Sequence, residues 1–314
     1  MPVGPHSNLR LKHIPSFKNY YSLEHISKSS SNIIPVNDIN LHYIDHKGDG
    51  PVLVLLHGLT ANAHAFDALI AGLHPTYRII CPDLRGNGLS DKPAFCYSVE
   101  EHVQDILELI SHIGEERVYL GGHSFGGYLA FYIAAYHPQV VAKLIILDAA
   151  KSLNPNAPQM LAGALSRLDA TYPSFDDYIA HVKKAPYLDF WDPAMLSYYR
   201  ADVHDLPDGS VKPRCNLMAI TEKSLALGTV DWPEVIEMIE QASLLVNALD
   251  IYTLGEPLLP DEIARETVEM MKNGKYVGVD GNHQTMLYGN GAQQSAEGIR
   301  VFLATAHTGT HAKN

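Results

Sequence analysis

The chain has little cysteine, no long apolar run and a shortage of positive charge, and each lack excludes a class of protein. Its 314 residues include three cysteines, Cys81, Cys96 and Cys215, an odd and widely spaced set that predicts reduced thiols rather than a disulfide framework. No apolar run approaches the roughly 20 residues of a membrane span. Because 23 Lys and Arg stand against 35 Asp and Glu without a basic stripe, nucleic-acid binding is not expected.

Two further absences concern a leader and a metal. Residues 1–34 contain Arg10 and Lys12 but no apolar h-region, so no signal peptide is expected. The expected reduced thiols predict a cytoplasmic compartment. The chain has 17 histidines, yet it holds neither an H-E-x-x-H motif nor a Cys/His cluster, so we expect no metal and no cofactor. With membrane and nucleic acid excluded, the expected partner is a small-molecule substrate.

The most informative motif is the run Gly121-Gly122-His123-Ser124-Phe125-Gly126-Gly127, which places a serine within G-x-S-x-G. The run follows a short apolar stretch and precedes a helical one, so a strand must turn sharply into a helix at Ser124. Gly122 and Gly126 lack the Cβ atoms that would clash in such a turn. We therefore predict that Ser124 is a nucleophile exposed at the carboxyl edge of a sheet.

A second apolar run, over 52–56, ends in His57-Gly58 and predicts a buried parallel strand. The loop that follows begins with Leu59. We predict that the backbone N–H of Leu59 supplies one half of an oxyanion hole and that the N–H of Phe125 supplies the other half.

A histidine near the end of the chain is the predicted general base. His283 follows Gly281-Asn282 and a short strand expected over 276–279. A lone histidine is usually a surface or core residue, but one that follows the last strand of a parallel sheet, downstream of a nucleophile, is placed to act as its base.

Together these motifs give the chain a resemblance to the alpha/beta-hydrolase fold superfamily. The matching stretches are VLVLLHG (52–58), CPDLRGNGLSDKP (81–93), GGHSFGG (121–127), LIILDAA (144–150) and GNH (281–283). The resemblance implies an α/β fold whose mostly parallel sheet carries helices on both faces. It also implies that the D-x-R-G-x-G stretch beginning at Asp83 is structural. It says little about the substrate, because this fold hosts many chemistries.

The resemblance also divides the chain into a core and an inserted cap. Strands and helices alternate over 35–150 and over 240–306, which we assign to the core, whereas 151–239 lacks this alternation and is expected to be a helical cap. Aromatic residues crowd the cap, where they form its own core or line an apolar pocket. Residues 1–34 predict a loosely packed N-terminal arm and 307–314 a polar tail, and arm and cap are candidate contacts for a homo-oligomer.

The acid of a catalytic triad is ambiguous. In most members of the superfamily it follows the strand before the last helix–strand unit, but the loop there is irregular, and neither Asp250 nor Glu256 fits the usual place. Other members carry the acid after the strand next to the nucleophile, where Asp148 stands 24 residues beyond Ser124. We take Asp148 as the acid that accepts a hydrogen bond from His283, with Glu256 and Asp250 as alternatives.

The implied function is that of a serine hydrolase that forms an acyl-enzyme. Relatives that act on epoxides or haloalkanes carry aspartate at the position of Ser124, so this serine argues against those reactions. The aromatic cap favours a carboxylic ester or lactone of a small to medium apolar substrate. Two alternatives stay open: a carbon–carbon bond hydrolase acting on a ring-cleavage product, and a non-catalytic ligand receptor on the same scaffold.

Overall fold

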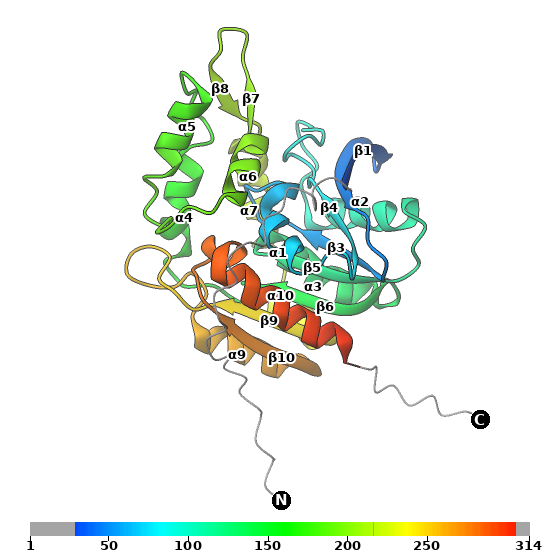
Figure 1. Ribbon diagram of the computed structural model, residues 1–314. Coiled ribbons are helices and arrows are strands. Elements are labelled where there is room, and N and C mark those ends of the chain that lie inside the picture. Colours follow the sequence, from blue (N-terminus) through cyan, green and yellow to red (C-terminus); the bar gives the residue numbers. More distant parts are fainter. Residues whose placement is uncertain (1–28, 216, 306–314) are drawn as a thin grey trace, which may run out of the picture.

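The computed structural model describes residues 29–215 and 217–305, which build one mixed sheet with helices on both faces (Figure 1). The eight strands lie in the order β1-β2-β4-β3-β5-β6-β9-β10. β2 runs antiparallel to its neighbours β1 and β4, and the other neighbouring pairs are parallel. The strands are β1 (Ser29–Val36), β2 (Ile39–His46), β3 (Val52–Leu56), β4 (Arg78–Pro82), β5 (Val118–His123), β6 (Val141–Leu147), β9 (Ala242–Ala248) and β10 (Asn273–Val279).

The central parallel strands arise from short apolar runs that are buried on both faces of the sheet. Every residue of β3 is buried. Side chains alternate along a strand, so Val54 and Leu56 join the core on one face while Leu53 and Leu55 join the core on the other. A strand covered on both faces has no polar side to present, which explains why its sequence is continuously apolar.

Helices cover the two faces as the predicted α/β class requires. Leu69 of α1 and Ile299 of α10 belong to one core, and Ile106 of α2, Phe131 of α3 and Ile236 of α8 belong to the other. These helices are α1 (Asp67–Ala71), α2 (Val99–His112), α3 (Phe125–Tyr136), α8 (Trp232–Glu237) and α10 (Gly289–Ala304), and α9 (Asp261–Met270) packs beside α8. The α/β fold class with a mostly parallel sheet is confirmed.

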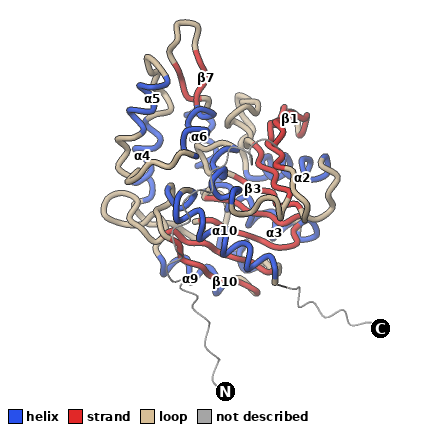
Figure 2. Tube along the Cα trace, viewed as in Figure 1, coloured by secondary structure: helices blue, strands red, loops and turns tan. Residues whose placement is uncertain are grey.

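The chain between β6 and α8 forms a mainly helical projection from the sheet (Figure 2). It contains α4 (Ala157–Ser166), α5 (Phe175–Val182), α6 (Ala194–Asp202) and α7 (Leu217–Leu227). It also contains a hairpin that the sequence analysis did not predict, β7 (Val203–Asp205) paired with β8 (Val211–Pro213). The turn holds Pro207-Asp208-Gly209, and Gly209 has a φ of +85°, so this tripeptide was the available signal.

The structure places two segments differently from the predicted organisation. Residues 29–34, assigned to the N-terminal arm, belong to β1, where Ser29 pairs with His46 and Ile34 with Leu41. The serine run hid this strand because serine carries no apolar signal, and pairing with β2 supplied the stabilisation. Residues 1–28 and the tail 307–314 lie outside the described residues.

The end of the predicted cap also packs differently. The segment 232–239 was placed in the cap, yet the Trp232 ring packs at a tilt against Tyr128 of α3 with ring centroids 4.6 Å apart, so α8 joins the core on one face of the sheet. Within the described residues, no helix combines the length and the apolar character that crossing a membrane demands.

Candidate active site

Ser124 stands where β5 turns into α3. Its backbone has φ +53° and ψ −117°, a conformation that strains a residue with a Cβ. The turn is so tight that a Cβ at Gly122 would lie 2.0 Å from the Gly126 oxygen, and a Cβ at Gly126 would lie 2.1 Å from the Leu56 oxygen. The hydroxyl makes no capping hydrogen bond to α3, and the residue is partly exposed. The structure thus presents this serine outward on a strand–turn–helix elbow.

Asp148 and His283 form a buried hydrogen-bonded pair. His283 Nδ1 donates to Asp148 Oδ2 at 2.7 Å, and Asp148 Oδ1 accepts the Ala248 N–H at 2.9 Å. Only 1% of Asp148 and 6% of His283 is exposed. Because a carboxylate only accepts, the proton of the neutral ring lies on Nδ1, which leaves Nε2 free to accept another. This is the arrangement that a general base requires.

The two alternative carboxylates make other contacts. Glu256 accepts from Asn154 Nδ2 at 2.6 Å, and Asp250 Oδ2 accepts the Gly281 N–H at 2.8 Å. Both residues are exposed at the surface. Of the three carboxylates considered from the sequence, Asp148 is the one that the structure brings to His283.

A second histidine packs against His283. The ring centroid of His123 lies 4.6 Å from that of His283, and His123 Nε2 donates to the His283 carbonyl oxygen at 2.9 Å. Burial lowers the pKa of His123 well below its ordinary value, so this ring is neutral. Ser124 follows His123 directly in the chain. His123 therefore ties the serine elbow to the loop of the candidate base, a role that the sequence analysis did not foresee.

His57 holds the peptide group that aims the Leu59 N–H. His57 Nε2 accepts the Leu84 N–H at 3.0 Å, so the ring carries its proton on Nδ1, which donates to the Gly58 oxygen at 2.7 Å. Burial lowers the pKa of His57 to about 4, so the ring is neutral near pH 7. The Gly58 carbonyl and the Leu59 N–H belong to one planar peptide group, and holding the first sets the direction of the second.

Asn87 holds the next part of the same loop. Its Nδ2 donates to the Leu59 oxygen at 3.1 Å and to the Ala61 oxygen at 2.9 Å. The other candidate donor, the N–H of Phe125, belongs to the first residue of α3, where a helix offers it no partner. The sequence analysis named both candidate oxyanion donors but neither of the side chains that hold the Leu59 loop.

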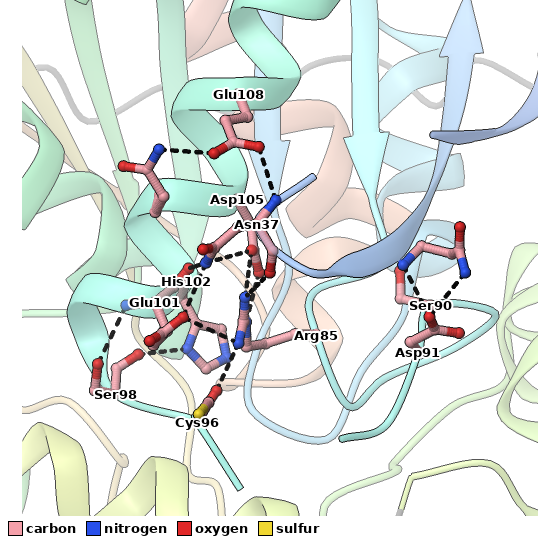
Figure 3. A network of polar contacts seen from close by, with 12 residues as sticks. Asn37, Arg85, Ser90, Asp91, Cys96, Ser98, Glu101, His102, Asp105 and Glu108 are labelled. Atoms are coloured by element: carbon pink, nitrogen blue, oxygen red, sulfur yellow. Dashed lines mark hydrogen bonds and ion pairs between the residues drawn. The ribbon is translucent and has the colours of Figure 1, made fainter. Parts of the chain in front are cut away.

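Buried charged groups support the loop that carries Asn87. The Asp83 carboxylate accepts one hydrogen bond from the Ala63 N–H and one from His42 Nδ1, each at 2.7 Å. Burial tends to raise the pKa of Asp83, but the hydrogen bond from His42 helps to outweigh it and the pKa lies at about 2. Arg85 pairs with both oxygens of Asp105, at 2.5 and 2.7 Å (Figure 3). These contacts are those of a structural loop.

A cavity of about 280 Å³ opens in the projection, between α4 and the end of α5, and Gly163, Arg167 and Tyr187 help to line it. Arg167 Nη2 donates to the Thr60 oxygen at 3.4 Å, next to Leu59. The Tyr187 ring stacks on Tyr252 at 5.2 Å, and Tyr252 meets the His283 ring edge-on at 5.7 Å. Arg167 therefore contacts the loop that follows Leu59 directly, whereas Tyr187 is connected to the candidate base only through Tyr252.

The crowded aromatic residues of the projection divide between the two alternatives left open by the sequence. Tyr172, Tyr178, Tyr198 and Tyr199 are buried in a core continuous with one face of the sheet. Tyr187 instead lines the cavity. The aromatic cluster is therefore mostly packing, with one ring at the cavity wall.

Comparison with known proteins points to one family. The model of the alpha/beta hydrolase fold family matches residues 51–286. This range includes Leu59, Ser124, Phe125, Asp148 and His283.

Relatives among characterised and catalogued proteins match over shorter stretches. A soluble epoxide hydrolase of Corynebacterium sp. (strain C12) is 38% identical over 113 residues, 36% of this chain and 39% of that protein. A 2-(acetamidomethylene)succinate hydrolase of Mesorhizobium japonicum is 31% identical over 134 residues, 43% of this chain and 47% of that protein. The chain therefore spans less than half the length of these relatives.

Solved structures match over nearly the whole described chain. An E-2-(acetamidomethylene)succinate hydrolase superposes with a TM-score of 0.76 at 22% identity, covering 88% of this chain and 100% of that one. The enol-lactonase from Burkholderia xenovorans LB400 gives a TM-score of 0.65 at 19% identity, covering 87% of this chain and 100% of that one. At these identities the likeness shows a shared fold.

Proposed function

This chain belongs to the alpha/beta hydrolase fold family, and we propose that it is a serine hydrolase that cleaves a carboxylic ester or lactone of a small to medium apolar substrate. The observation that carries the proposal is the 2.7 Å hydrogen bond between His283 Nδ1 and Asp148 Oδ2, next to the strained turn that presents Ser124. The carboxylate sets the tautomer of the histidine, whose Nε2 then takes the proton of the serine.

The proposed reaction has two halves. Ser124 Oγ attacks the carbonyl carbon while His283 Nε2 takes the hydroxyl proton, and the N–H groups of Leu59 and Phe125 stabilise the resulting oxyanion. The tetrahedral intermediate collapses, the C–O bond breaks, and the leaving alkoxide receives the proton from His283. Water, deprotonated by His283, then attacks the acyl-enzyme and releases the acid and free Ser124. The Asp148 carboxylate stabilises the imidazolium that forms in each half.

Three observations support the proposal. The nucleophile position holds serine, whereas relatives that open epoxides or displace halide carry aspartate there. One structure with the same fold is an enol-lactonase, so this fold can accommodate lactone hydrolysis. The cavity in the projection has the Tyr187 ring in its wall, which suits an apolar group on the substrate.

The test is hydrolysis of p-nitrophenyl esters of increasing chain length by wild type and Ser124→Ala, with labelling of the same proteins by a fluorophosphonate. Wild type should turn over esters and take up one label at Ser124, and Ser124→Ala should lose both. Ser111→Ala, an exposed serine on α2, is the matched control and should behave as wild type.

The other outcomes separate the alternatives. A labelled serine with no ester turnover, together with cleavage of a vinylogous diketone acid, would favour the carbon–carbon hydrolase. A ligand that raises the melting temperature without being turned over would favour a receptor. Absence of both labelling and turnover in wild type overturns the serine hydrolase proposal.

A further inference from the structure

Lys223 is a fully buried lysine that points from the projection toward the serine elbow. It lies on α7, where Ala219, Ile220 and Lys223 are the buried residues, so it occupies a position where an amphipathic helix normally carries an apolar side chain. None of its surface is exposed. Its Nζ lies 5.6 Å from the ring centroid of Tyr97 and 6.0 Å from that of Phe125.

The ammonium of Lys223 has no carboxylate beside it. Within 29–215 and 217–305 it forms no ion pair, and its hydrogen bond goes to Asn87 Oδ1. Gly86 leaves room for it, because a Cβ at that position would lie 3.2 Å from Nζ. A buried charge without an opposite charge costs folding free energy. A lysine at this place therefore indicates a task that an apolar residue cannot perform.

The bond from Lys223 decides which way the Asn87 side chain faces. An amide has one acceptor end and one donor end, and an ammonium can only donate, so Oδ1 must face Lys223. Nδ2 then faces the loop and donates to the Leu59 and Ala61 oxygens. The ammonium and the two loop carbonyls therefore select the same amide orientation, and without the ammonium the Oδ1 end loses the donor that anchors it.

We propose that Lys223 is a positioning residue for the oxyanion hole: it orients the Asn87 amide, and Asn87 holds the loop that aims the Leu59 N–H. The catalytic consequence rests on the proposed function, since an oxyanion hole matters only if acyl transfer occurs. Lys223 touches no substrate in this scheme. The oxyanion forms in the transition state and not in the bound substrate. Removing Lys223 should therefore lower kcat and leave KM nearly unchanged.

The charge of Lys223 is itself adjustable by pH. Burial lowers the pKa of Lys223 to about 8. The titratable groups that face it are Arg85 and Lys92 after β4, His102 and Asp105 on α2, His57 after β3, and Cys215 before α7. Arg85 and Asp105 pair with each other, so their charges largely offset. Above pH 8 the bond to Asn87 changes from charge-assisted to neutral and weakens.

The first test compares kcat and KM across pH for wild type, Lys223→Arg and Lys223→Met on a p-nitrophenyl ester. Wild-type kcat should fall as pH rises through about 8. Lys223→Arg stays charged and should keep its kcat to higher pH. Lys223→Met should lose about tenfold or more in kcat, with KM within about twofold, and should lack the alkaline fall. Lys272→Met, which removes a surface lysine paired with Glu240, is the control.

The second test needs no turnover. Amide hydrogen exchange over 58–62 should quicken in Lys223→Met and in Asn87→Ala, and should stay near the wild-type rate in Lys223→Arg. The double variant should exchange no faster than the faster single variant, because both changes break one link. If Lys223→Met does not fold, Asn87→Asp serves instead, since it keeps an acceptor for Lys223 but removes both donors to the loop.

These readouts separate the two proposals. If amide exchange over 58–62 stays at the wild-type rate in Lys223→Met and Asn87→Ala, the proposed role of Lys223 is overturned, whatever the activity of these variants. Faster exchange in an enzyme that hydrolyses no ester would retain Lys223 as the support of the loop while the proposed function fails. If kcat of Lys223→Met falls above pH 8 as it does in the wild type, Lys223 does not set this pH dependence, and the result contradicts the proposal.

Discussion

Asp250 and Gly281 hold each other through two hydrogen bonds: the Asp250 N–H donates to the Gly281 oxygen at 3.0 Å, and the Gly281 N–H donates to Asp250 Oδ2 at 2.8 Å. The two residues follow the neighbouring parallel strands β9 and β10. Gly281 has φ +93°, and a Cβ there would lie 2.7 Å from the Met286 nitrogen. A carboxylate weighed from the sequence as a triad acid instead supports the loop that carries His283.

Removing that support should slow the enzyme without removing its chemistry. Asp250→Ala loses the acceptor for the Gly281 N–H, so we expect a loss of about 1 kcal/mol in the free energy of unfolding. A looser His283 loop should lower kcat several-fold on a p-nitrophenyl ester. Urea unfolding and steady-state kinetics measure the two effects. Asp189→Ala, at an exposed loop position, is the control, and equal effects of both variants would contradict the prediction.

Asp148→Asn should be far more damaging than Glu256→Gln. An asparagine can turn its Nδ2 toward His283 Nδ1, which favours the wrong tautomer, so kcat should fall by about a thousandfold or more. Glu256→Gln removes only the charge that faces Asn154 and should leave kcat within about twofold. Steady-state kinetics of the purified variants decide between them. The reverse order of effects would move the acid to the loop after β9.

The protein should lose stability as pH falls from about 6.5 toward 4. Burial lowers the pKa of His57 to about 4, so the unfolded chain binds its proton at higher pH than the folded chain does. The contribution of His57 to the free energy of unfolding is therefore complete above pH 6.5 and is lost as pH falls below it. At pH 4 the loss from this residue alone is about 3 kcal/mol. His102 and His123, whose pKa values burial also lowers, add to the decline.

Urea unfolding between pH 4 and 8 measures this effect. His57→Gln should be less stable than wild type at pH 8, because it loses the bonds to Leu84 and Gly58, but its stability should depend less steeply on pH. A wild-type stability that stays flat from pH 6.5 to 4 would show that these rings do not stay neutral in the folded state.

Gly163 offers a way to test whether the cavity receives the substrate. It lies on α4 at the cavity wall, and a Cβ built there meets nothing within 4 Å. Gly163→Ala should raise the free energy of unfolding by about 0.5–1 kcal/mol, because alanine loses less backbone entropy in a helix. Gly163→Phe should fill the cavity and shift the kcat/KM optimum toward shorter acyl chains. An unchanged optimum would place the acyl chain elsewhere.

Local patterns were enough to predict most of the fold. The apolar run of β3, the glycines around Ser124 and the amphipathic stripe of α2 each specify their own element through short-range sterics and burial. The errors fall where an element depends on a distant partner. The serine-rich β1 exists because β2 pairs with it, and α8 joins the core because Trp232 finds Tyr128.

The amino-acid sequence by itself determined the elbow, the two backbone positions of the candidate oxyanion hole and the candidate base, because each depends on a few consecutive residues. Only the tertiary structure decided which carboxylate meets His283. Asp148 lies 135 residues away and reaches it because the ends of parallel strands converge at one edge of the sheet. The packing of α7 against the core brings Lys223 of the projection to Asn87, a contact across 136 residues that no local pattern encodes.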